Sequence, residues 1–173
     1  MKERTKMFKV LISTGAAMAL VIALALSQPA QPAAAVITEN VITGAGAGIY
    51  PAGATFNGIQ LAGSTFGFGV QTNTDGSGKG DFEMQINGSS PIGLSQWITI
   101  TGWINSGTVN TDGTVTLQGT CTLDMGDGTV PLAGVPFTVA IATNADDKGT
   151  LTLSLATTNL PAAQVNVGSM KIK

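Results

Sequence analysis

The stretch of sequence closest to a chemical motif is rich in oxygen-bearing side chains and glycine. Four of its residues have the spacing of the first, third, fifth and ninth positions of a calcium-binding loop: Asn73, Asp75, Ser77 and Asp81. The bidentate glutamate that such a loop needs at its twelfth position is replaced by Met84. We therefore treat these four residues as a weak metal-site candidate and favour a plain hairpin turn.

Asp81 and Glu83 are the nearest approach to a catalytic pair of carboxylates. Glycoside hydrolysis needs two carboxyl groups held at a fixed separation across a cleft. The alternation of this segment instead places both acids on the outward face of one strand, and Arg4 is the only arginine of the chain. We interpret the two residues as solvated surface acids.

Histidine is absent from all 173 residues. Its absence removes the most common general base and metal ligand, and with it catalytic triads, zinc sites and most metal-dependent hydrolysis. Cys121 is the only cysteine, so no disulfide can form within the chain. We therefore predict that the protein is not an enzyme and uses no cofactor.

Two tryptophans complete the set of candidates. Alternation places them with two threonines on one face of a strand, opposite a row of isoleucines. Exposed indole rings beside hydroxyl groups could stack a sugar or line a ligand pocket. The ligand-binding candidate is therefore Trp97, Thr99, Thr101 and Trp103. The favoured alternative is a bulge at Gly102 that returns Trp103 to the core, with Trp97 covering one end of the fold.

Strict alternation of apolar and polar residues defines the strands that must position these side chains. It is clearest over residues 114–123, where Cys121 falls on the apolar face and is predicted to be a core residue. Eight such segments follow Val36, joined by Asp-Gly turns and without a helical period. We predict one all-β domain, a single antiparallel meander of about eight strands, with an up-and-down barrel favoured over a sandwich.

Glycine marks two irregular places in this pattern. Gly67 and Gly69 alternate with phenylalanines and are interpreted as sites of sheet curvature. In the last strand, Val165 falls out of phase with Met170, and this predicts a β-bulge at Gly168-Ser169.

The first 35 residues have the order of a secretory signal peptide. A basic start is followed by an uncharged apolar run over residues 10–26 and by a proline-broken segment that ends at Ala35. We expect cleavage after Ala35, which divides the chain into a signal peptide at 1–35 and one domain at 36–173. An uncleaved anchor is the alternative, but the apolar run lies at the lower limit for crossing a bilayer. The domain is expected to be secreted or otherwise extracytoplasmic.

Charge limits the partners of residues 36–173. Nine acidic side chains against four lysines give a formal charge of −5, which disfavours nucleic acid and anionic membranes. We expect no nucleic-acid partner and no membrane partner after signal cleavage. Surface or matrix components, a small ligand and a homo-oligomer are left open.

A series of short motifs runs through most of the predicted domain. They are Gly44 to Ile49, Thr65-Phe66-Gly67-Phe68, Gly78-Lys79-Gly80-Asp81-Phe82, Gly119-Thr120-Cys121, Pro136-Phe137-Thr138-Val139 and Gly168-Ser169-Met170-Lys171-Ile172. In this order they resemble a loosely defined group of bacterial secreted β domains found after choice-of-anchor modules. The chain departs from that group in lacking histidine after the Gly-Asp-Phe position and in its short loop at residues 144–147. The resemblance implies export and a β fold, and it implies no activity.

The expected function is therefore that of an exported, non-catalytic structural or interaction domain. The alternative is a β-barrel that binds a small ligand or a carbohydrate through Trp97 and Trp103. An outer-membrane barrel is disfavoured, because one tyrosine and two tryptophans cannot supply its aromatic girdles.

Overall fold

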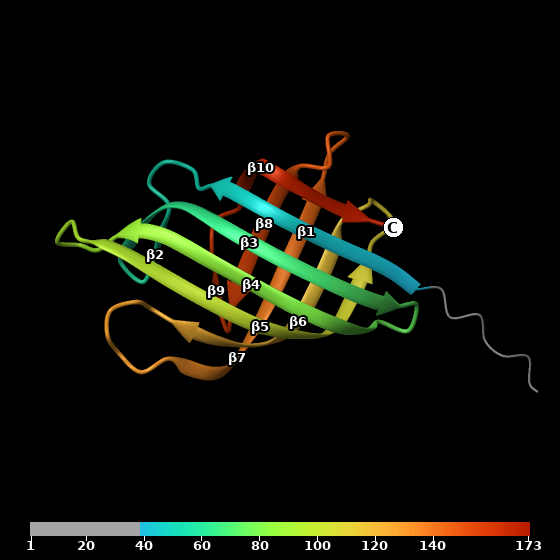
Figure 1. The fold of residues 1–173 in the computed structure, drawn as a ribbon, viewed down its shortest axis with the longest axis horizontal. Coiled ribbons are helices and arrows are strands. Elements are labelled where there is room, and N and C mark those ends of the chain that lie inside the picture. Colours follow the sequence, from blue (N-terminus) through green and yellow to red (C-terminus); the bar gives the residue numbers. More distant parts are fainter. Residues whose placement is uncertain (1–38) are drawn as a thin grey trace, which may run out of the picture. The chain divides into compact units, whose positions relative to one another are not determined.

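The computed structural model describes residues 39–173, so the predicted signal peptide at 1–35 lies outside the described residues. Within them every regular element is a β-strand, which confirms the predicted all-β class (Figure 1). The strands are β1 (Glu39–Ile49), β2 (Thr55–Phe56), β3 (Ile59–Asn73), β4 (Ser77–Ser89), β5 (Ser95–Val109), β6 (Val115–Asp124), β7 (Leu132–Thr143), β8 (Gly149–Leu155), β9 (Thr158–Asn159) and β10 (Ala163–Ile172). Eight are seven residues or longer, and β2 and β9 are two-residue additions. No helix long and apolar enough to cross a membrane occurs in this part of the chain.

All ten strands belong to one antiparallel sheet, as the Asp-Gly turns predict. Its order is β1-β10-β8-β7-β6-β5-β4-β3-β2, and β1 also pairs with β3 along its whole length. The pairing therefore returns to its starting strand through eight strands, each hydrogen-bonded to its neighbours in an up-and-down sequence. A ring of this kind leaves one side of every strand facing inward and the other facing solvent.

The ring is weakest between β8 and β10. Only three residue pairs join these strands, from Ala163↔Leu151 to Val165↔Gly149, whereas β1 and β10 share eight. Beyond them the β7–β8 turn continues the contact: the Met170 amide donates to the Asp147 carbonyl at 2.6 Å, and Lys171 forms an ion pair with Asp147 at 3.3 Å.

Side chains fill the interior of the ring. Alternate residues are buried along most of β3, β5, β6 and β8. A row of four phenylalanines crosses the core, with ring centroids 5.4 to 6.4 Å apart: Phe66, Phe68, Phe82 and Phe137. Cys121 is one of the buried residues, as predicted, and burial raises the pKa of its thiol. Burial of this apolar surface is the main favourable term for folding. With a single cysteine in the chain, no disulfide within the protein adds to it.

The bulge in the last strand lies two residues earlier than the sequence predicts. Gly48 pairs with Val165 and Ala47 with Val167, so Asn166 is the extra residue. Val165 is consequently buried while Val167 is exposed. Gly168 instead adopts a positive φ of 87°, and a side chain there would meet the carbonyl oxygen of Ala45.

Candidate functional site

The outward side of β5 carries the predicted ligand-binding residues. Trp97, Thr99, Thr101 and Trp103 alternate with the buried residues Ile98, Ile100, Gly102 and Ile104. The two indoles are 52% and 53% exposed, an unusual condition for the largest apolar side chains. The structure therefore brings all four candidates onto one solvent-facing surface.

The favoured alternative, a bulge at Gly102, is wrong. Gly102 pairs regularly with Phe82 on one side and Cys121 on the other. It is buried because the Phe137 ring occupies the space beside it: a Cβ on Gly102 would stand 2.7 Å from that ring. The irregularity of β5 comes later, between Ile104 and Ser106, so Trp103 stays outside.

Two neighbouring strands extend this surface. On β4 the residues opposite the tryptophan-threonine row are Asn87, Gln85, Glu83 and Asp81. On β3, Thr65 lies beyond Gln85, Gly67 beyond Glu83 and Gly69 beyond Asp81. We call the outward side chains of these three strands the tryptophan face: Thr65, Gly67, Gly69, Asp81, Glu83, Gln85, Asn87, Trp97, Thr99, Thr101 and Trp103.

The glycines of β3 leave an open strip along the tryptophan face. A Cβ on Gly67 or Gly69 would have nothing within 4 Å, so the side-chain position of each glycine faces open space. The sequence-based interpretation of these two residues as curvature sites missed this role. The signal was present in the same alternation, since Phe66 and Phe68 point inward and the glycines between them must point outward.

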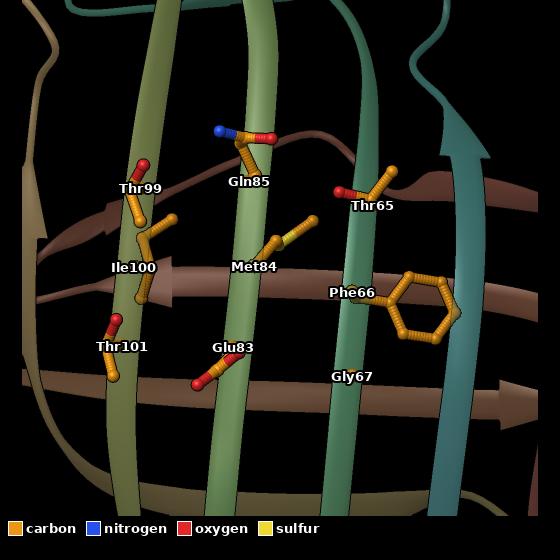
Figure 2. Close-up of a pocket in the computed structure, with 9 residues that line it drawn as sticks. All are labelled: Thr65, Phe66, Gly67, Glu83, Met84, Gln85, Thr99, Ile100 and Thr101. Atoms are coloured by element: carbon orange, nitrogen blue, oxygen red, sulfur yellow. The ribbon is translucent and has the colours of Figure 1, made fainter.

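A shallow hollow of about 430 Å³ lies at the centre of the tryptophan face. Its polar rim is formed by Thr65, Gln85 and Thr99 on one side and by Glu83 and Thr101 on the other, and Figure 2 shows the Glu83 carboxylate leaning toward β5. Two further hollows, of about 330 and 270 Å³, both include Trp103 and Asp81 in their walls. The indole of Trp103 thus stands between two depressions in the surface.

The length of the tryptophan face limits what it can hold. Trp97 and Trp103 are six residues apart on one extended strand, which separates them by roughly 20 Å. One sugar ring or one small molecule cannot contact both indoles. A ligand that uses the whole face must be extended along β5.

The four metal-site candidates do not form one cluster. In the β3–β4 turn, Asp75 accepts hydrogen bonds from the Ser77 amide at 2.8 Å and the Ser77 hydroxyl at 2.6 Å, and Asn73 donates to Ser77 at 2.9 Å. Asp81 lies farther along β4 beside Trp103. Residues 39–173 contain no group of three acidic, cysteine or histidine side chains placed to hold a metal.

The same turn is built again elsewhere in the chain. Asp112 accepts from the Thr114 amide at 2.9 Å and hydroxyl at 2.7 Å, and Asp127 does so from Thr129 at 2.9 and 2.6 Å. The glycine after each aspartate has a φ of 82° to 84°, which a turn of this kind requires. The repetition favours a structural role for Asp75 in its turn.

Comparison of the chain with family models, with curated proteins and with solved structures finds no match.

Proposed function

We propose that this protein is an exported, non-catalytic binding domain that holds an extended carbohydrate chain on its tryptophan face. The observation that carries the proposal is the placement of both tryptophans, half exposed, on the outward side of β5. An indole ring stacks on the apolar face of a sugar, and leaving two such rings in water is costly without a partner.

The polar residues between the indoles suit the hydroxyl groups of a sugar chain. Thr99 and Thr101 supply hydroxyls, Gln85 and Asn87 supply amides, and Glu83 supplies a carboxylate that accepts from hydroxyl donors. The strip at Gly67 and Gly69 leaves room for a chain that is wider than one strand. Hydrogen bonds here fix the orientation of the ligand, while the indoles provide most of the contact area.

An enclosed small ligand is less well supported, because core side chains occupy the interior of the ring. A purely structural role leaves the two exposed indoles without an explanation. A catalytic role lacks the most common general base, since the chain has no histidine. Export is proposed from the signal-peptide order of residues 1–35, and the resemblance to secreted β domains agrees with it.

The test is a binding titration against linear oligosaccharides of increasing length, followed by Trp fluorescence and calorimetry. We expect affinity to rise with length until the ligand spans both indoles. Trp97→Ala and Trp103→Ala should each weaken binding of the long ligand by tenfold or more. A short ligand contacts one indole, so only one of the two substitutions should weaken its binding. Val167→Ala is the matched control, because Val167 is exposed to a similar degree on β10.

Two results would overturn the proposal. One is a panel of neutral and acidic linear glycans in which none binds the wild-type protein. The other is binding that both tryptophan variants retain in full. Unchanged thermal unfolding of the variants is the check that the fold is intact, since neither indole is part of the core.

A further inference from the structure

The loops at the two ends of the strand ring differ in chemistry. One end carries the turns at residues 73–77, 110–114 and 144–148 together with Glu39 and Lys173, the first and last described residues. These turns hold Asp75, Asp112, Asp146, Asp147 and Lys148. The other end carries the loops at 50–58, 90–94, 125–131 and 156–162, where Asp127 is the only charged residue. Figure 1 shows the β4–β5 turn and the carboxyl terminus at opposite ends of the strands.

Large apolar side chains project from the second end. Ile92 is 81% exposed and Leu94 63% exposed in the β4–β5 turn, and Val130 is 86% and Leu132 59% exposed at the β6–β7 connection. We call these four residues the apolar tip. Each stands apart from the core, and together they place more apolar surface in water than isolated surface residues normally do.

Hydrogen bonds within the loops hold this arrangement. In the β4–β5 turn, the Ser90 amide donates to the Leu94 carbonyl at 2.8 Å, and the Leu94 amide donates to the Ser90 hydroxyl at 3.1 Å. The side-chain amide of Gln96 donates to the Met125 carbonyl at 2.8 Å and joins the bases of the two connections. The loops are therefore ordered with their apolar side chains outward, and they are not collapsed onto the core.

We propose that the apolar tip inserts into the surface of an uncharged lipid bilayer. Three of the four tip residues lie in connections between strands, and Leu132 is the first residue of β7, so the tip projects as loops. None of the hollows described above lies between these loops for a protein partner's side chain to fill. The near absence of charge at this end removes the cost of desolvating ions and gives no attraction to anionic headgroups. Trp97 stands at the base of the β4–β5 turn, and indoles favour the boundary between water and lipid.

This proposal departs from the expectation of no membrane partner after signal cleavage. That expectation rests on a formal charge of −5, which argues against anionic surfaces only. Most charged residues lie at the other end and along the sides, so they remain in water when the tip is inserted. Asp127 is the one charged residue that shares a connection with a tip residue, Val130. The four tip residues are not part of the tryptophan face, and Trp97 is the one residue that both proposals use.

The experiment is flotation with phosphatidylcholine vesicles, using protein recovered after export from an expression host, with its amino terminus identified by mass spectrometry. We expect the wild-type protein to float with the vesicles, equally at low and high salt. Ile92→Ser and Val130→Ser should each reduce partitioning roughly tenfold, and the double variant should stay in solution. The Val167→Ser variant is the control and should float like the wild type, because Val167 is an exposed apolar residue on β10, away from the apolar tip.

Trp fluorescence supplies a second readout that is specific to depth. Bromine-labelled lipids should quench the emission of a Trp103→Phe variant, in which Trp97 is the only indole, more strongly than that of Trp97→Phe.

The proposal is overturned if the wild type does not float, if only anionic vesicles bind it, or if the tip variants float equally well. It is also overturned if sedimentation shows a dimer that the tip variants abolish, because the tip would then bind a second copy.

Discussion

The inward and outward sides of β5 have different compositions and different tasks. On the inward side, Ile98, Ile100 and Ile104 are 0% exposed and pack against neighbouring strands. On the outward side, Trp97 and Trp103 are half exposed and stand among polar residues. Because successive side chains of a strand point to opposite faces, adjacent residues can serve stability and recognition separately. Substitutions on the two sides should therefore have separable effects.

The sharpest test of that separation compares Ile100 with its neighbour Thr101. Ile100→Ala removes fully buried atoms and leaves a cavity, which should lower the free energy of unfolding by about 2–5 kcal/mol. Thr101→Ala removes an exposed hydroxyl and an exposed methyl group, and should change the free energy of unfolding by less than about 0.5 kcal/mol. Urea denaturation followed by circular dichroism measures both. Equal losses would show that the outward side also holds the fold together.

Two glycines on other strands differ in how they tolerate a methyl group: Gly119 on β6 lies against the backbone of β5, and Gly67 lies on the outward side of β3. A Cβ on Gly119 would stand 1.9 Å from the carbonyl oxygen of Trp103, so β5 and β6 would have to separate. We expect Gly119→Ala to cost about 1–3 kcal/mol of unfolding free energy, the usual cost of overpacking. Gly67→Ala adds its methyl group to open space and should cost about 0.5 kcal/mol at most. Denaturation midpoints of the two variants provide the comparison, which fails if Gly67→Ala is the more damaging change.

Ionisation gives a third contrast, because the interior opposes charge. Burial raises the pKa of Tyr50 to about 12, and the Ser64 hydroxyl offsets part of the rise. The folded state holds this proton more tightly than the unfolded state, whose pKa is about 10. The contribution to stability is thus complete below pH 10 and is lost as the pH rises toward 12. The loss at pH 11 should be about 1.4 kcal/mol.

Tyr50 is the only tyrosine, so ultraviolet titration of its phenolate reports this group alone. Tyr50→Phe is the matched control for denaturation between pH 9 and 11, since it keeps the ring and removes the titrating hydroxyl. The variant should lose less stability over that range than the wild type. A phenolate that forms near pH 10 in the folded protein would contradict the prediction.

Much of this fold could be predicted from the sequence, because alternation in strands is a local pattern. The inward position of Cys121 and the outward position of Asp81 and Glu83 follow directly from it. Whether Trp103 points inward or outward depends on where the bulge in β5 lies. The sequence alone did not show whether it lies at Gly102 or between Ile104 and Ser106. That choice is made by Phe137, a residue on a strand distant in sequence whose ring fills the space beside Gly102.

The apolar tip could not be predicted in the same way. Ile92, Leu94 and Val130 lie in connections, where no period shows whether an apolar side chain turns inward or outward. Their direction is set by turn hydrogen bonds such as the one between Ser90 and Leu94. The open strip at Gly67 could have been predicted, since it follows from the inward position of Phe66.

The smallest expected effect is in the turns at the end of the strand ring that carries Asp75 and Asp112. These turns favour the ionised form of their carboxyl groups, whereas the interior opposes charge. Hydrogen bonds from the Thr114 hydroxyl and amide lower the pKa of Asp112 below its ordinary value of 3.8. The folded state therefore favours the carboxylate, and this contribution to stability is present above pH 3.8 and is lost as the pH falls through the lowered pKa. Asp112→Asn keeps an acceptor for Thr114 and removes the titration. Melting temperatures of both proteins between pH 2.5 and 6 should differ most near pH 6 and converge in acid. A difference that stays constant over this range would mean that Asp112 acts through turn geometry, and its charge would have no part in the stability of that end.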